Sequence, residues 1–165
     1  MSMIEVLRRV SSAELEEIIK TEKFFLNLED DWRSKTDSCI DIDKSWDAIH
    51  NLLKGGSSSI EASFLAHMAI HGHTPIDSMD GGWGPATYLE PDQVVEVNEF
   101  LTNVTVDEIR KHYNPESLDS ANIYPNIWWR EKEEDLEYIL HFFIQVKKLY
   151  KDAAKAGECI LMIIF

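Results

Sequence analysis

The residues with the greatest capacity for chemistry crowd into the segment from Cys39 to Leu53. Two carboxylates, an amine, an indole and an imidazole follow one another within it: Asp41, Asp43, Lys44, Trp46 and His50. Such groups hold cations, move protons and bind polar small molecules when they share one cleft. They therefore indicate either a candidate ligand-binding cleft, completed from elsewhere in the fold by Tyr124 and Trp128, or a helix entry whose polar groups satisfy one another.

The two aspartates also have a structural interpretation. Asp41-Ile42-Asp43 resembles the D-x-D element that holds a divalent ion beside a sugar nucleotide, but no nucleotide-binding α/β sheet is predicted to support it. The i, i+3, i+4, i+7 spacing of one helical face is instead found in Trp46, Ile49, His50 and Leu53. We interpret Asp43 as the N-cap of that helix, because a carboxylate there accepts hydrogen bonds from first-turn amides.

A second group of ligating side chains consists of His67, His71 and His73. Residues 60–70 fit both a helix and a strand, and we predict an extended segment. The three imidazoles then project to one side, where they could bind zinc together with a carboxylate from the following loop. The spacing matches no established zinc motif and HExxH is absent, so ordinary solvent-facing histidines are the alternative and no cofactor is predicted.

The two cysteines, Cys39 and Cys159, lie far apart and form no CxxC pair. This is the pattern of reduced thiols rather than of a disulfide framework or a structural zinc set. Nucleophilic catalysis by Cys39 with His50, or by a serine of residues 57–59, has no GxSxG or cysteine-protease motif to support it. We expect neither chemistry.

Charge and composition restrict the partners. The 165 residues carry 30 acidic and 16 basic side chains, a formal net charge of −14, which repels nucleic-acid phosphates and anionic lipid headgroups. The acidity suits a basic protein partner, and a small-molecule ligand is not excluded. The charged N-terminus lacks a signal-peptide pattern and the longest apolar run is far too short to span a bilayer, so we predict a cytoplasmic protein that binds neither nucleic acid nor membrane.

Periodicity and capping signals predict an α+β fold in a single domain spanning residues 1–165. The clearest elements are strands at 3–10 and 159–165 and helices at 11–20, 21–28, 43–53, 91–101, 105–114 and 131–156. Residues 72–85 are rich in turn residues and are predicted to form a mobile loop. The final segment is apolar throughout, so we expect a small mixed or antiparallel sheet with the N- and C-terminal strands central, packed against several helices including the long C-terminal one.

Several blocks together resemble the YfbM-like family over nearly the whole chain. They are residues 3–11, 41–53, 84–89 and 123–128, followed by the long helix and the apolar terminal strand. The family is a domain of unknown function with an α+β fold, so the resemblance supports the architecture and implies no reaction. The chain departs from the family pattern at His71-Gly72-His73, where a glycine pair is preferred, and at Glu90, where Ser or Thr is expected before Pro91.

Two classes of function stay open, and we favour the first. It is a non-catalytic, acidic binding module with a protein partner, of which immunity towards a basic toxin is a specific form. The other is a small-molecule or hydrolytic site formed by Asp41, Lys44, His50, Tyr124 and Trp128. A concave pocket with perturbed pKa values where these groups converge would favour the second class, whereas a purely capping Asp43 and a packed His50 would exclude it.

Overall fold

The computed structural model describes residues 2–23, 37–55, 59–128, 130 and 132–165. Within them, five strands form one antiparallel sheet in the order β2 (Cys39–Asp41), β1 (Glu5–Val10), β5 (Cys159–Ile164), β4 (Pro85–Leu89) and β3 (Thr74–Asp80). The terminal strands β1 and β5 pair along their whole length at the centre, as predicted. The predicted helix at 21–28 falls largely outside the described residues.

Strand β5 is apolar throughout because both faces of the sheet are covered. Leu161 packs on one face beside Val6, and Met162 packs on the other beside Leu7. Alternate residues of a strand point to opposite faces, so a continuous apolar run supplies both layers at once.

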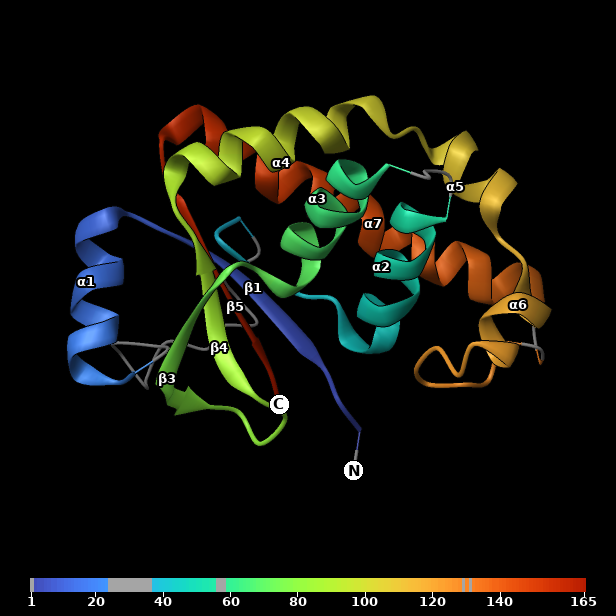
Figure 1. Cartoon of the computed structure of the whole chain (residues 1–165), viewed down its shortest axis with the longest axis horizontal. Coiled ribbons are helices and arrows are strands. Elements are labelled where there is room, and N and C mark those ends of the chain that lie inside the picture. Colours follow the sequence, from blue (N-terminus) through green and yellow to red (C-terminus); the bar gives the residue numbers. More distant parts are fainter. Residues whose placement is uncertain (1, 24–36, 56–58, 129, 131) are drawn as a thin grey trace.

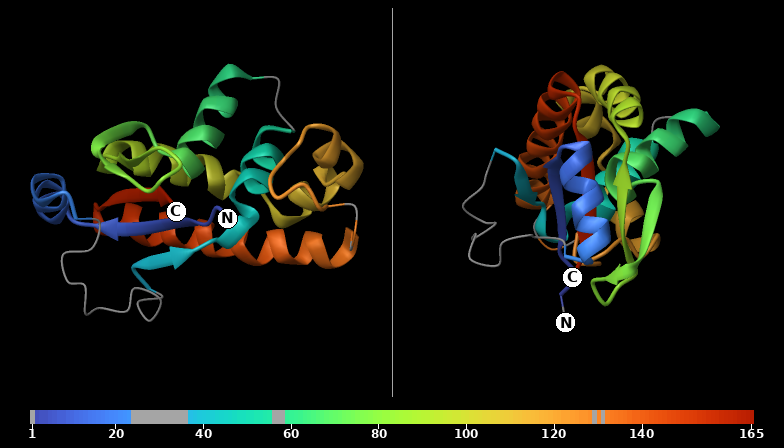
Figure 2. Two further views of the ribbon diagram at one scale, coloured as in Figure 1. Left: turned by 90° about the horizontal axis from the view of Figure 1, so that it is seen from below. Right: turned by 90° about the vertical axis from the view of Figure 1, so that its left-hand side faces the viewer.

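The helices divide unequally between the two faces (Figures 1 and 2). Helix α1 (Ser12–Thr21) covers the face that carries Val6 and Leu161. The opposite layer contains α2 (Trp46–Lys54), α3 (Ile60–His71), α4 (Pro91–Asn103), α5 (Val106–His112), α6 (Pro115–Ser120) and α7 (Lys132–Ala156). Among the helices of the described residues, none is both long and apolar enough to cross a membrane.

Helices α1 and α5 begin at the predicted caps. The Ser11 hydroxyl accepts a hydrogen bond from the Glu14 amide at 3.1 Å, which begins α1. Before α5, the Thr105 amide donates to the Glu108 carboxylate at 2.7 Å, and the Glu108 amide donates back to the Thr105 hydroxyl at 3.1 Å. This reciprocal pattern is a capping box. Ahead of α4, the Glu90 amide donates to the Gln93 side chain at 2.9 Å, so this start is secured without a hydroxyl cap.

Two sequence predictions were wrong. Residues 60–70 form helix α3 rather than an extended segment, and its apolar side chains occur on all sides, which removes the periodicity that marks a surface helix. Residues 72–85, predicted as a mobile loop, contain all of β3, paired with β4. A register shift between Ile76 and Asp80 interrupts the alternation of β3 and hides the strand pattern.

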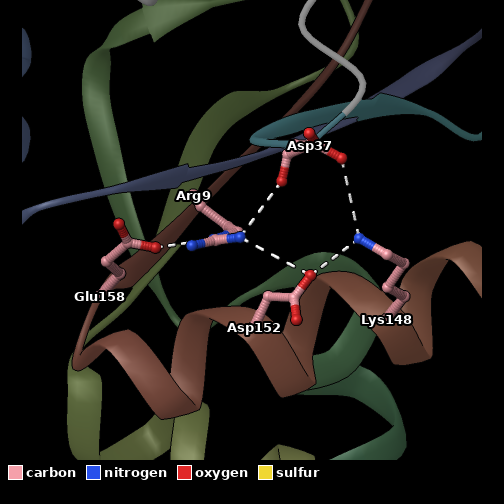
Figure 3. Close-up of polar contacts among 5 residues, drawn as sticks. All are labelled: Arg9, Asp37, Lys148, Asp152 and Glu158. Atoms are coloured by element: carbon pink, nitrogen blue, oxygen red, sulfur yellow. Dashed lines mark hydrogen bonds and ion pairs between the residues drawn. The ribbon is translucent and has the colours of Figure 1, made fainter.

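An ion-pair network fastens the central sheet to helix α7 (Figure 3). The Arg9 guanidinium on β1 donates to the Glu158 carboxylate at 2.7 Å and to the Asp37 carbonyl at 3.2 Å. It also lies 3.8 Å from the Asp152 carboxylate, which accepts from Lys148 at 2.9 Å. The groups are partly exposed, so the network adds little to the folding stability and mainly fixes how α7 is oriented against β1.

Candidate functional site

The two aspartates of the predicted cleft bind neighbouring groups of the fold. The Asp41 carboxylate accepts a hydrogen bond from the Asp43 amide at 2.7 Å. Asp43 in turn accepts from the Tyr138 hydroxyl at 2.9 Å, and that hydroxyl accepts from the Lys44 amide at 3.1 Å. These contacts fix the connection between β2 and α2 against α7, and none of the three predicted cleft residues lines the cavity described below.

Asp43 is not an N-cap, which corrects the sequence interpretation. The chain enters α2 through a short 3₁₀ turn, η2 (Asp43–Ser45), in which Asp43 has a left-handed φ of 48°. An N-cap residue has extended backbone angles, so Asp43 cannot aim its carboxylate at the first-turn amides. Its carboxylate instead accepts the hydrogen bond from the Tyr138 hydroxyl.

Trp128 does not line a cleft, because its side chain lies in the core. Its side chain is only 1% exposed and packs in the main core. The indole N–H donates to the Ile123 carbonyl at 2.9 Å, which satisfies the polar end of the ring inside the core. Its neighbour Trp129 lies outside the described residues.

Tyr124 lies against Trp46, the first residue of helix α2. Its ring stacks on Trp46 with centroids 5.6 Å apart and an angle of 21°. The Tyr124 hydroxyl accepts from the Met3 amide at 2.9 Å, and its own amide donates to Asp47 at 2.8 Å. Trp46 then contacts the ring of His71 edge-on at 5.7 Å, which links this aromatic pair to the histidines.

Three histidines converge where α2 packs on α3, and we call them the histidine cluster: His50, His67 and His71. Helical spacing places His67 and His71 four residues apart on one face of α3. His50 approaches from α2, and its Nδ1 lies 3.2 Å from Nε2 of His71. Each residue offers one nitrogen such that the three atoms all lie within 4.8 Å of one another.

The metal-ligand group predicted from the sequence contained His73 in place of His50. His73 follows Gly72, which has a left-handed φ of 67°, and the turn carries His73 out of the cluster to an exposed position against Phe64. The extended prediction for residues 60–70 placed His73 beside His67 and His71, whereas the helix replaces it with His50. The i, i+4 spacing of His67 and His71 was the sequence signal that pointed to this arrangement.

Burial holds the cluster neutral. It lowers the pKa of His50 to about 4, with smaller contributions from the nearby charges of Lys54 and His67. Burial, followed by repulsion from His50, lowers the pKa of His71 to about 3, and burial also lowers the pKa of His67. Neutral imidazoles keep a lone pair on one nitrogen, which is the form that binds metals.

His50 retains unused bonding capacity. Its Nε2 is buried and has no hydrogen-bond partner among the described residues. Whichever ring donates in the 3.2 Å contact between His50 and His71, Nε2 of His50 remains either an unmatched donor or an unmatched acceptor. Buried polar atoms normally find a partner, so this nitrogen still has the capacity for one more hydrogen bond.

A cavity of about 270 Å³ adjoins the cluster, and His67 and His71 both line it. Glu5 lines it from β1, with a side chain that is 1% exposed and an Oε2 that has no partner in the described part of the chain. Burial, and then the charge of Asp47, raise the pKa of the Glu5 carboxyl well above its usual range. Glu5 was not among the predicted site residues, although strand alternation places it on the same face as the buried Leu7.

Comparison with known proteins identifies the family. The sequence model described as "Domain of unknown function (DUF1877)" matches residues 1–163. The chain belongs to this family. Protein YfbM of Escherichia coli (strain K12) is 27% identical to the DUF1877 chain over 130 residues, which cover 76% of this chain and 75% of YfbM. The predicted resemblance to the YfbM-like family is thereby confirmed.

A solved structure supports the architecture. The crystal structure of YfbM from Escherichia coli, described as a protein of unknown function, matches the DUF1877 chain with a TM-score of 0.70 over 98% of this chain and 99% of that one. At 17% identity over this alignment, the likeness shows the fold. The α+β prediction is confirmed.

The DUF1877 site therefore combines three kinds of group: neutral imidazoles, a buried carboxyl and an apolar wall. Met162 of β5 and Trp83, from the turn between β3 and β4, form part of that wall. Thr87 holds the end of α3 in place, because its hydroxyl donates to the His71 carbonyl at 2.8 Å. Imidazole nitrogens beside a partly open cavity are suited to binding a transition metal together with a small molecule.

Proposed function

We propose that this DUF1877 protein binds a divalent transition metal, with zinc as the first candidate, through His50, His67 and His71. The observation that carries the proposal is the convergence of three nitrogen atoms within 4.8 Å. Zinc–nitrogen bonds of about 2.0–2.1 Å at tetrahedral angles hold ligand nitrogens about 3.3 Å apart. Nδ1 of His50 and Nε2 of His71 are already 3.2 Å apart, and a nitrogen of the exposed His67 lies within 4.8 Å of this pair.

The neutral state of the cluster supports the same proposal. Protons compete with metals for imidazole nitrogen, and burial keeps the pKa values of His50 and His71 at about 4 and about 3. Metal binding therefore requires no proton loss from these rings near pH 7.

A three-histidine site leaves a coordination position for water or a small molecule, as in catalytic zinc sites. In this protein the cavity beside His67 and His71 would receive that molecule, with Glu5 inside it. A small-molecule site of this kind lies beside the place where the cleft was predicted from the sequence. His50, Trp46 and Tyr124 lie near this site as well. Glu5, His67 and His71 take the places of Asp41, Lys44 and Trp128.

Calorimetric titration of the metal-free protein with zinc chloride tests the proposal. We expect one zinc ion per chain, and we expect His67→Ala to weaken binding by about a hundredfold or more, because it removes a direct ligand. His67 is exposed, so its loss should leave the fold intact. His73→Ala, an exposed histidine outside the cluster, is the matched control and should bind as the wild type does. Equal weakening by the two variants, or no binding by the wild type, would refute the site.

A further inference from the structure

Helix α3 carries an apolar face that the core does not cover. Ile60 is 89% exposed and Phe64, one turn later, is 48% exposed. The helix lies at the outer edge of the helical layer (Figure 2), yet its apolar side chains occur on every side. A helix that is apolar all round is normally buried, so the outer face of α3 has the character of a surface that is covered by another molecule.

A groove runs between this face and helix α4. It has a volume of about 530 Å³, and its apolar lining includes Phe64 and Leu65 from α3 and Phe100 from α4. The acidic side chains that line it are Glu61, Glu96 and Glu99. The described residues that line it include no lysine or arginine, so apolar surface and uncompensated negative charge occur together.

We propose that the groove between α3 and α4 binds a basic amphipathic helix of a partner protein. Apolar side chains spaced three and four residues apart would lie between Phe64 and Phe100, as in other helix-in-groove complexes. Lysine or arginine side chains on the flanks of that helix would face the three carboxylates, which gives the charge complementarity that selects a partner.

The charge of the groove argues against other occupants. A second copy of the chain, docked through the same face, would bring Glu96 and Glu99 against their own equivalents, because a twofold interface pairs each patch with itself. Two chains with a formal net charge of −14 each would also repel one another. A basic partner turns both repulsions into attraction. The groove residues that the structure describes include none of the three histidines of the cluster.

The test uses a fluorescently labelled helical peptide of leucine and lysine with leucines at i, i+3, i+4 and i+7, measured by fluorescence anisotropy. An identical peptide with glutamate in place of lysine is the probe control. We expect the full-length protein to bind the lysine peptide, and Phe64→Ala and Glu96→Gln/Glu99→Gln each to weaken that binding at least tenfold. Thermal melting confirms that both variants fold, as their exposed positions lead us to expect.

The matched protein control removes the same charge elsewhere. Glu16 and Glu17 are exposed on α1, on the opposite side of the sheet, and Glu16→Gln/Glu17→Gln should leave peptide affinity unchanged. Equal weakening by the α1 and α4 variants would mean general attraction to an acidic protein and would overturn the groove. Binding of the glutamate peptide, absence of lysine-peptide binding, or self-association abolished by Phe64→Ala would overturn it as well.

Discussion

At the scale of single residues, the histidine cluster makes the folding stability of the protein sensitive to acid. His50 and His71 have pKa values of about 4 and about 3 in the folded protein, against about 6.5 in an unfolded chain. Between these values the unfolded state binds more protons, so folding stability contributed by the two rings is complete above pH 6.5 and falls as the pH drops towards 3. A metal-free protein should therefore lose stability in mild acid.

The corresponding prediction concerns His71→Gln. Because glutamine does not titrate, urea unfolding between pH 7 and pH 4 should show a shallower loss of stability in this variant than in the wild type. His73→Gln, which also removes one histidine but lies outside the cluster, should retain the wild-type slope. Parallel slopes for all three proteins would mean that burial does not hold His71 neutral.

Glu5 makes the opposite contribution. Its folded pKa is raised by burial and by Asp47, so the stability associated with its carboxyl is present at low pH and is lost as the pH rises through the folded pKa. Glu5→Gln removes the ionisation. We expect the variant to be more stable than the wild type by about 1–3 kcal/mol at pH 8, with a smaller difference at pH 5, as measured by urea unfolding. A destabilised variant at pH 8 would indicate that the ionised carboxylate has a partner.

At the scale of elements, the connection between α6 and α7 is held to the core by Trp128. The indole is 1% exposed and its N–H donates to the Ile123 carbonyl. Trp128→Ala should reduce the free energy of unfolding by about 3–5 kcal/mol, the usual result of deleting a large buried side chain. Trp83→Ala is the matched control, because Trp83 is 47% exposed and its loss should change stability by less than about 1 kcal/mol. Similar values for the two would place Trp128 outside the core.

Elements with strong local signals could be predicted from the sequence. The apolar run of β5 indicated a central strand, and capping signals located the starts of α1 and α5. Helix α3 could not be predicted in this way, because apolar residues on all its sides leave no period to detect. The irregular β3 was hidden by its register shift.

The membership of the histidine cluster depends on helix α3, which was predicted as an extended segment. With residues 60–70 extended, His67, His71 and His73 shared one side and His50 stayed apart. The helix exchanges His73 for His50, and only the packing of α2 on α3 brings His50 to 3.2 Å from His71. Long-range contacts of this kind, like the stacking of Tyr124 on Trp46, depend on how distant elements pack and cannot be derived from local sequence patterns.

At the scale of the whole molecule, α3 connects two separate surfaces. Its C-terminal half supplies His67 and His71 to the cavity beside the sheet, and its N-terminal half presents Phe64 to the groove beside α4. A metal that joins α2 to α3 would fix the position of this helix and, with it, one wall of the groove. The family fold therefore brings a proposed ligand site and a proposed docking surface onto one helix (Figure 1).

The most direct test of the metal site is an anomalous difference map at the zinc edge from crystals grown with zinc. The account predicts one strong peak bonded to nitrogens of His50, His67 and His71 at about 2.0–2.1 Å, absent from crystals of His67→Ala. A map without a peak between these rings, or with zinc only at His73 or at surface carboxylates, would contradict it.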